Sequence, residues 1–463
     1  MPTKREDIEQ WSRSYYLLKK YVDICFRFYF KNTIEGVGNI PKDKPIIFAP
    51  NHQNALMDAL AVLCTKTWQP VFVARADIFK KPLINKILTF LKILPIFRIR
   101  DGYENLQKND EVFNKTIDVI KNRNGLVILP EGNHGEKKRL RPLKKGIARI
   151  ALQAENSLNG ELDIQIVPVG LDYTNYIKVR SGLLIRFGNP IPVKSLTKLY
   201  NQNPAKAHNL LIELVGKGLN PEMIDIEDEK YYNIYKIILD MFTRVCIQRK
   251  GIKDNHSNQF TTQKLIIAKL DKFKNSRFDD FLLLAADALE YNLLLNRRDF
   301  TSNTYPMNSN NKWAFVPFAI ALLALSPLFL YSFINNLIPI SGIKLLSGKI
   351  KDKQFISSIR FTAGLILFPL FHAIQVTVFA IITKSLVFTL AYTVLLPISV
   401  YFFFLYKGWF EKFWEWSKEI KITLFSPKRI IRLNELHRDI VSQMWKIVEF
   451  TDEDEYMKIS SKN

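Results

Sequence analysis

Short apolar runs that end at a proline or a polar turn recur through the first 200 residues of the chain. Runs without polar alternation are typical of strands buried on both faces of a parallel sheet. They lie at residues 46–49, 71–74, 126–129, 164–170 and 183–187. Segments with helical periodicity separate them, at about 55–64, 77–92, 110–122 and 146–155. This alternation predicts an α/β fold with a mixed, mostly parallel sheet flanked by helices.

The pattern changes after residue 200. Apolar positions that recur every three or four residues predict packed helices at 205–219, 229–250, 262–273 and 278–295. Residues 361–383 and 386–406 carry no acidic or basic group other than one histidine, and each reaches the ~20 residues needed to cross a bilayer. Residues 313–340 are also apolar but contain Pro327 and Pro339. We expect a broken, re-entrant hairpin there, because it leaves both flanking basic segments on the cytoplasmic side.

These patterns divide the chain into six segments. Residues 1–34 form an aromatic and basic N-terminal helix that lies at the membrane interface or docks on the protein's own core. The following segments are the α/β domain (35–200), a helical extension (201–300), a linker rich in Asn, Ser and Thr (301–312), a transmembrane region (313–410) and a cytoplasmic amphipathic tail (411–463).

Composition and charge narrow the partners. Hydrophobic residues make up 48% of the 463 residues, 24% are charged, and the net charge is +22. Such a charge suits nucleic acid, anionic lipid headgroups or anionic substrates. The chain has no zinc-ligand spacing and no aromatic-studded basic strands, so we expect no nucleic acid partner. Three scattered cysteines and a charged N-terminus predict a reducing, cytoplasmic side without a disulfide framework, a metal site or a signal peptide.

The turn after the first apolar run carries a candidate catalytic pair. His52 and Asp58 are six residues apart, which on a regular helix corresponds to about 600° and separates the two side chains. They meet only if His52 lies in the turn before the helix and leans back over its first residues. An aspartate on one imidazole nitrogen leaves the other free as a general base. The alternative is a surface histidine beside an ordinary helix cap.

Later turns supply groups suited to a phosphorylated substrate. Arg98 and Arg100 alternate with apolar residues in a strand and therefore share one face, where guanidinium forks can hold a phosphate. Solvation of an exposed strand is the alternative. Gly132 allows close approach of a ligand, and Glu131 can bond glycerol hydroxyls or hold a neighbouring arginine. The basic run that follows includes Lys144 and is either a solvated face or a phosphate site.

Taken together, these blocks resemble the glycerolipid acyltransferase family, the enzymes that acylate glycerol-3-phosphate or lysophosphatidate. The resemblance covers about residues 35–195. The blocks are Asn51-His52 with Asp58, Phe97-Arg98-Ile99-Arg100, Pro130-Glu131-Gly132-Asn133 and Val167-Pro168-Val169-Gly170. Five residues separate His52 from Asp58, where the commonest family spacing has four. The longer spacing is similar to that of some glycerol-3-phosphate acyltransferases. Asn133 stands where the family usually has threonine or serine.

The resemblance implies the glycerolipid acyltransferase fold, with His52 and Asp58 as the catalytic pair. It implies a phosphate and glycerol site made by Arg98, Arg100, Glu131, Gly132, Asn133 and Lys144, and an acyl-site wall that includes Pro168. The implied reaction moves a fatty acyl group from acyl-coenzyme A or acyl carrier protein, as co-substrate, to glycerol-3-phosphate in phospholipid biosynthesis, without a metal or bound cofactor.

The alternatives are a lysophosphatidate or other lysophospholipid acceptor, and a catalytically inactive lipid-binding scaffold. With any of these, we expect a multi-pass protein of the phospholipid membrane whose catalytic domain faces the cytoplasm.

Overall fold

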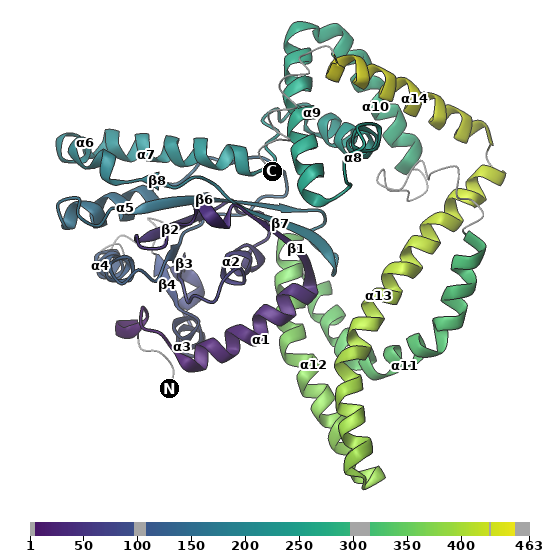
Figure 1. Ribbon diagram of the computed structural model, residues 1–463, viewed down its shortest axis with the longest axis horizontal. Helices are drawn as coiled ribbons and strands as arrows, with labels where there is room; N and C mark the ends of the chain where they lie inside the picture. Colours follow the sequence, from purple (N-terminus) through teal and green to yellow (C-terminus); the bar gives the residue numbers. More distant parts are fainter. Residues whose placement is uncertain (1–4, 97–107, 297–314, 426, 450–463) are drawn as a thin grey trace. The chain divides into compact units, whose positions relative to one another are not determined.

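The computed structural model describes residues 5–96, 108–296, 315–425 and 427–449 (Figure 1). The chain divides by its contacts into two compact units. The first is Met1–Asp225 with Pro339–Pro369, and the second is Ile226–Ile338 with Leu370–Asn463. A part of the apolar C-terminal third therefore packs with the N-terminal α/β domain.

An eight-stranded sheet forms the centre of the first unit, in the order β1-β7-β6-β2-β5-β3-β4, with β8 paired to β6. The pairs β1·β7, β2·β5, β2·β6, β3·β4 and β3·β5 are parallel, whereas β7 and β8 run antiparallel to β6. The strands are β1 (Phe30–Glu35), β2 (Ile46–Pro50), β3 (Val71–Arg75), β4 (Ile93–Ile96), β5 (Leu126–Val127), β6 (Gln165–Tyr173), β7 (Ser181–Phe187) and β8 (Ile191–Pro192). The predicted mixed, mostly parallel sheet is confirmed. Strand β1 is a finding of the structure, since its residues continue an aromatic, basic pattern that predicts helix.

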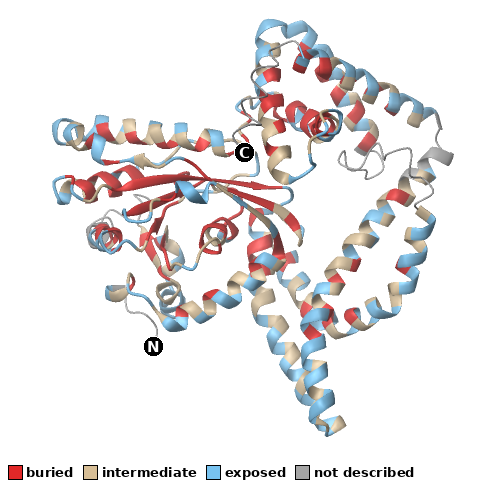
Figure 2. Cartoon of the chain, viewed as in Figure 1, coloured by how far each residue is buried: buried red, intermediate tan, exposed pale blue. Residues whose placement is uncertain are grey.

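Helices cover both faces of this sheet, and the strands are buried between them (Figure 2). The helices of the first unit are α1 (Arg13–Tyr29), α2 (Leu56–Leu63), α3 (Pro82–Phe90), α4 (Lys108–Lys121), α5 (Gly146–Ser157), α6 (Thr197–Gln202) and α7 (Pro204–Leu219). Short 3-10 helices lie at Arg5–Asp7, Val37–Asn39, Ala76–Phe79, Lys194–Leu196 and Asn220–Glu222. Ile47 packs in the core under α4, α5 and α7, and the next residue, Phe48, packs in the core under α1 and α2. Burial on both sides explains why the strands read as unbroken apolar runs.

The glycine at position 170, in the fourth sequence block, is required because there is no space for a side chain. A Cβ on Gly170 in β6 would lie 1.7 Å from the carbonyl oxygen of Glu222, so the chain after α7 crosses directly over the strand at this position. Helix α7 therefore packs with the sheet and belongs to the first unit, although the sequence segments end the α/β domain at residue 200.

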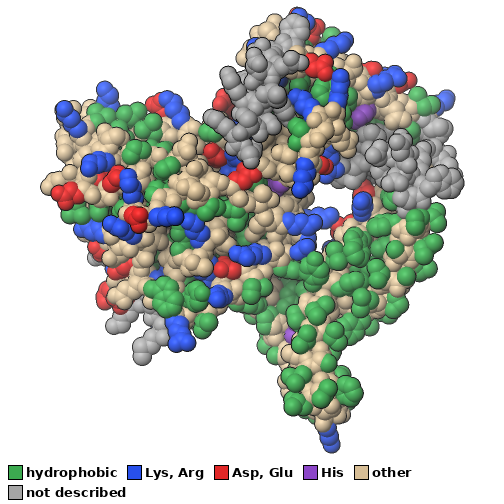
Figure 3. All heavy atoms as spheres, in the orientation of Figure 1, with side chains coloured by type: hydrophobic (Ala, Val, Ile, Leu, Met, Phe, Trp, Pro, Cys, Tyr) green, Lys and Arg blue, Asp and Glu red, His purple; other side chains and the backbone are tan. Residues whose placement is uncertain are grey.

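The second unit consists of helices. They are α8 (Tyr232–Arg249), α9 (His256–Ser276), α10 (Phe278–Asn296), α13 (Leu386–Phe425), α14 (Pro427–Glu449), most of α11 (Phe315–Gly348) and the later part of α12 (Gln354–Thr383). Helix α14 packs on α8, α9 and α10. Among the described residues, α11, α12 and α13 are long and apolar enough to cross a membrane. Their surface is almost continuously hydrophobic in Figure 3.

The segment 313–340, predicted to be a broken hairpin, is corrected by the structure: α11 is one continuous helix. Pro339 has no N–H to donate to the carbonyl oxygen of Asn335, four residues earlier. That oxygen instead accepts a hydrogen bond from Gln375 Nε2 of α12 at 2.8 Å. A side chain from a neighbouring helix thus replaces the missing backbone bond, which is how apolar helices tolerate proline.

Candidate active site

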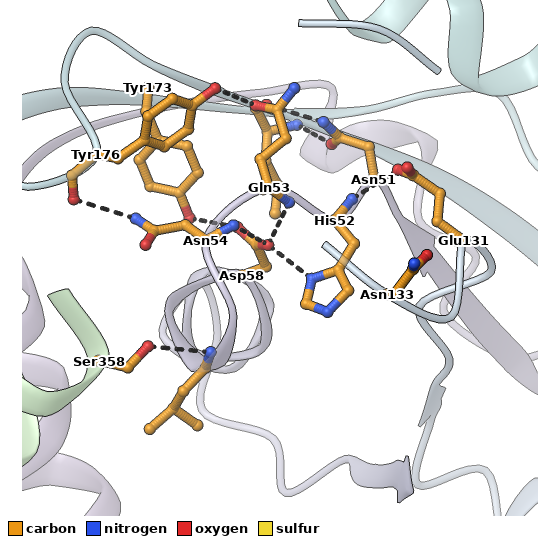
Figure 4. Close-up of polar contacts among 12 residues, drawn as sticks. Asn51, His52, Gln53, Asn54, Asp58, Glu131, Asn133, Tyr173, Tyr176 and Ser358 are labelled. Carbon is orange, nitrogen blue, oxygen red and sulfur yellow. Dashed lines mark hydrogen bonds and ion pairs between the residues drawn. The ribbon is translucent and has the colours of Figure 1, made fainter. Parts of the chain in front are cut away.

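His52 lies in the turn between β2 and α2, at the carboxyl end of the sheet strand. Its Nδ1 is 2.9 Å from Asp58 Oδ2, and Figure 4 shows the imidazole leaning back over the first turn of α2. This is the geometry that the six-residue spacing requires. The His52 side chain is 14% exposed, whereas the Asp58 side chain is completely buried.

Asp58 accepts hydrogen bonds from four groups. Besides His52, its Oδ2 accepts the backbone N–H groups of Gln53 and Asn54, each at 2.7 Å, and its Oδ1 accepts the Tyr173 hydroxyl at 2.7 Å. These four donors hold the carboxylate in one orientation. Burial, followed by the proximity of Asp58, raises the pKa of Tyr173 well above its usual value, so this hydroxyl stays protonated and donates. Asp58 is therefore fixed as an acceptor for His52 Nδ1, which leaves Nε2 free, as the predicted role of general base requires.

The turn that carries His52 is anchored at both ends. Asn51 is buried, and its side-chain amide exchanges two hydrogen bonds with the backbone of Leu171 in β6, at 2.7 and 3.1 Å. Ala55 adopts φ 44° and ψ −122°, a region that L-residues rarely occupy. Such a backbone costs about 1–3 kcal/mol and persists only where its surroundings hold it. The Leu56 N–H that follows donates to Ser358 Oγ at 3.2 Å.

Glu131 and Arg141 form hydrogen bonds with the backbone of His52. Glu131 Oε1 accepts the His52 backbone N–H at 2.8 Å, and Arg141 Nη2 donates to the His52 carbonyl oxygen at 2.6 Å. Arg141 Nε also donates to Glu131 Oε2 at 2.6 Å. Burial raises the pKa of Glu131, and Arg141 and the His52 N–H counteract that rise. Of the two roles expected for Glu131, the structure contains the arginine contact.

Residues 31–172, which include the His52 turn and the Glu131–Arg141 pair, match the family model described as Acyltransferase. These residues form an acyltransferase-family domain.

The acyltransferase domain is similar to three characterised proteins. Glycerol-3-phosphate O-acyltransferases 1 and 2 of Saccharomyces cerevisiae are 27% identical over 134 residues and 29% identical over 112 residues, which is 28% and 24% of this chain. The 1-acyl-sn-glycerol-3-phosphate acyltransferase of Borreliella burgdorferi is 26% identical over 151 residues, or 33% of this chain. The aligned regions span 18% and 15% of the two yeast proteins and 55% of the bacterial one.

Among solved structures, the 1-acyl-sn-glycerophosphate (LPA) acyltransferase PlsC from Thermotoga maritima matches 44% of this chain and 78% of its own. The sequence identity is 20% and the TM-score is 0.32. A TM-score this low transfers no detail to the present chain.

The predicted substrate residues of the acyltransferase domain fall into different surroundings. Gly132 has φ 73°, and a Cβ there would lie 3.1 Å from Lys144 Cγ. Asn133 Oδ1 accepts a long hydrogen bond from Arg141 Nη1, at 3.4 Å. The Lys144 side chain is exposed, and its ammonium makes no hydrogen bond or ion pair with any residue that the structure describes. Their roles toward substrate stay predictions.

Arg98 and Arg100 lie outside the described residues, so their predicted phosphate contacts stay predictions. The buried Pro168 packs against α7, where a Cβ on Gly218 would lie 2.7 Å from Pro168 Cγ. Pro168 therefore supports β6 from the face covered by α7, and its predicted role at an acyl-site wall remains untested.

Two residues near the predicted catalytic pair of the acyltransferase domain, Arg141 and Tyr173, were not identified from the sequence. Arg141 belongs to the basic run, but nothing in that run distinguishes it from Lys144. Tyr173 shares a strand face with Leu171, so extending the predicted strand by three residues would have placed it beside α2. The His134 ring lies 5.4 Å from the His52 ring at an interplanar angle of 86°. Among the described residues, no group of three or more His, Cys, Asp and Glu side chains is arranged to hold a metal ion.

Proposed function

We propose that this chain is a membrane-bound O-acyltransferase that moves a fatty acyl group from an acyl thioester to glycerol-3-phosphate. The observation that carries the proposal is the 2.9 Å contact of His52 with a buried, fourfold hydrogen-bonded Asp58 inside an acyltransferase-family domain. The names of the two yeast relatives and the long His52–Asp58 spacing support glycerol-3-phosphate as the acceptor.

The catalytic pair performs general-base chemistry in this reaction. His52 Nε2 takes the proton of an acceptor hydroxyl while the hydroxyl oxygen attacks the thioester carbonyl carbon. The carbon–sulfur bond then breaks, and the leaving thiolate receives the proton from the imidazolium. Asp58 keeps His52 in the correct tautomer and stabilises the imidazolium that forms. This sequence of steps needs no covalent acyl-enzyme.

The phosphate of the acceptor would be bound by basic groups near Gly132. Lys144 is exposed beside that glycine and presents an ammonium to solvent. We assign Arg98 and Arg100 to the same phosphate on the strength of the family resemblance, because a guanidinium can make two parallel bonds to a phosphate. Coenzyme A and acyl carrier protein both present a thioester on a phosphopantetheine arm, so either is a suitable donor.

A membrane topology follows from the hairpin that α12 and α13 form. The two helices are joined by a short turn at Lys384, so two crossings return α13 to the side on which α12 begins. We infer that the start of α12 and the end of α13 lie on one side of the membrane.

This topology also agrees with the charges. The turn between α11 and α12 carries three lysines, at 349, 351 and 353, and basic residues continue after Tyr406. Positively charged segments next to membrane helices favour the cytoplasmic side. We therefore place the catalytic unit on the cytoplasmic face of a multi-pass membrane protein.

Lysophosphatidate is a second candidate acceptor. The observation that favours it is the Borreliella burgdorferi relative, which is named for acylation of 1-acyl-sn-glycerol-3-phosphate and is matched over 55% of its length, more than either yeast relative. Both acceptors offer a hydroxyl next to a phosphomonoester, so the same base and the same cations serve either.

The test is acyl transfer by the purified, detergent-solubilised chain. Radiolabelled glycerol-3-phosphate and lysophosphatidate are offered separately, each with palmitoyl-coenzyme A and with palmitoyl-acyl carrier protein. We expect product from one acceptor and a loss of about 10²-fold or more in His52→Ala, which is the usual contribution of a general base. His256→Ala, in the second unit, is the matched control and should keep wild-type activity.

Two results would contradict the proposal. No product from either acceptor, with folded protein and both donors, would exclude glycerolipid acyl transfer and favour the lipid-binding scaffold. Product that survives in His52→Ala would show that a different group is the base.

A further inference from the structure

The beginning of α12 lies against the catalytic turn of the acyltransferase domain. Residues 339–369 comprise the end of the apolar helix α11, the turn after it and the first part of the apolar helix α12, and they pack in the same compact unit as the sheet. Phe361 of α12 belongs to the buried core cluster that also contains Phe26 and Tyr29 of α1. The Tyr21 hydroxyl of α1 donates to the Leu365 carbonyl oxygen of α12 at 2.9 Å. These contacts hold the first turns of α12 firmly on the domain.

Ser358 reaches the turn between the two catalytic residues. Its Oγ accepts the backbone N–H of Leu56 at 3.2 Å, and Ser358 is buried (Figure 4). Leu56 is the first residue of α2, and its N–H has no partner within that helix. It directly follows Ala55, whose positive φ is unfavourable for a residue with a side chain. The hydroxyl from α12 therefore stabilises the backbone between His52 and Asp58 at its most strained point.

Asp352 makes a second, separate contact with the site. Its Oδ2 lies 3.2 Å from His134 Nε2, and its Oδ1 accepts the backbone N–H of Gln354 at 3.1 Å. Phe355, the second residue of α12, packs edge-on against the His134 ring at 4.7 Å between centroids. His134 in turn lies edge-on to the His52 ring. The start of α12 thus fixes the orientation of the imidazole that neighbours the catalytic base.

We propose that residues 352–358 form a part of the catalytic site, in which Ser358 and Asp352 are positioning residues. Ser358 holds the turn that sets the His52–Asp58 geometry, and Asp352 holds His134 beside His52. The geometry of the general base therefore depends on residues 352–358 being packed against the acyltransferase domain. The catalytic consequence rests on the proposed acyl transfer, whereas the positioning itself does not.

The experiment uses the full chain in detergent with two measurements. The first is steady-state acyl transfer, and the second is the rate at which diethyl pyrocarbonate modifies each histidine, resolved by peptide mass spectrometry. Ser358→Ala removes the acceptor for Leu56, while Ser358→Thr keeps a hydroxyl. Thr377→Ala is the matched control, because the Thr377 hydroxyl on the same helix donates to the Ala373 carbonyl oxygen.

We expect Ser358→Ala to lower kcat about threefold to tenfold, the range for one lost hydrogen bond, with KM nearly unchanged. We expect slower modification of His52 in the same variant, because a loosened Asp58 contact makes Nε2 less nucleophilic. Ser358→Thr should restore both values, and Thr377→Ala should alter neither. A loss of stability alone would not lower kcat at an unchanged KM together with slower His52 modification, with both values restored by Ser358→Thr.

Asp352→Asn tests the second contact. Asparagine keeps the cap on the Gln354 N–H but removes the charge from His134. We expect at least a twofold faster modification of His134, because its imidazole loses a charged partner, together with a lower kcat. Wild-type rates of His52 and His134 modification in Ser358→Ala and Asp352→Asn would overturn the inference. Absence of acyl transfer by the wild type would instead contradict the proposed function, and the modification rates would still decide the positioning.

Discussion

Replacing Tyr173 with phenylalanine would remove one hydroxyl from a completely buried carboxylate. In the structure the Tyr173 hydroxyl is the donor to Asp58 Oδ1, at 2.7 Å, while the other three donors converge on Oδ2. Burial keeps this hydroxyl protonated across the physiological pH range, so it remains a donor to Asp58 Oδ1.

The size of the effect follows from the chemistry of the bond. A hydrogen bond to a buried charged group contributes about 1.5–3 kcal/mol. Without the hydroxyl, Asp58 Oδ1 loses its donor, and the carboxylate orients the His52 imidazole less well. The barrier to acyl transfer should therefore rise by a similar amount, which corresponds to a fall of about 10-fold to 10²-fold in kcat/KM.

The assay is steady-state acyl transfer, with kcat/KM as the measured quantity. We expect Tyr173→Phe to lower kcat/KM about 10-fold to 10²-fold. Tyr176→Phe is the matched control, because the Tyr176 hydroxyl donates to Gln53 Oε1 rather than to Asp58. Equal kcat/KM values for wild type and Tyr173→Phe would refute the reasoning.

Other substitutions test the surroundings of the site. Arg141→Lys keeps the charge but cannot bond the His52 carbonyl oxygen and Glu131 with the same fork, so we expect kcat to fall about tenfold, or about 1.4 kcal/mol, in steady-state kinetics. Gly170→Ala would place a Cβ 1.7 Å from the Glu222 carbonyl oxygen, and we expect about 3 kcal/mol or more of destabilisation, seen as a lower melting temperature. Burial lowers the pKa of Lys92 to about 8, from 10.5. Between these pH values the unfolded chain holds a proton that the folded chain lacks, so the thermal stability of wild type relative to Lys92→Met should rise with pH.

Each of these three predictions has a control variant and a result that would contradict it. Arg149→Lys changes an exposed arginine on α5 and should leave kcat unaltered, and an unaltered kcat in Arg141→Lys would mean that one contact suffices. Gly38→Ala introduces a Cβ with no neighbour within 4 Å and should melt like wild type. If Gly170→Ala also melts like wild type, the chain at Glu222 moves freely. Parallel stability curves for wild type and Lys92→Met would show that Lys92 stays charged in the folded protein.

Local pattern was sufficient for the elements and for the catalytic pair. The apolar runs predicted most of the strands because a sheet covered on both faces buries every residue of its central strands, as in β2 and β6. The His52–Asp58 contact was predictable because both residues belong to one strand–turn–helix unit, where six residues allow a single way to meet. Two of the apolar stretches were found because a membrane helix needs an uninterrupted length.

The pattern did not show which residues distant in the sequence form hydrogen bonds with the buried polar groups of the site. Tyr173 and Ser358 lie 115 and 302 residues from the groups that they bond, so no periodicity connects them. A proline in the sequence shows that one backbone N–H donor is missing, but it does not show which group replaces that donor. In α11 the replacement is the side chain of Gln375, which lies on another helix. The periodicity of apolar positions shows which face of a helix or strand is buried. The hydrogen-bond partners of its polar groups depend on tertiary packing. The sequence by itself therefore determined most of the sheet and the pairing of His52 with Asp58, and only the tertiary structure decided which side chains hold that pair in place.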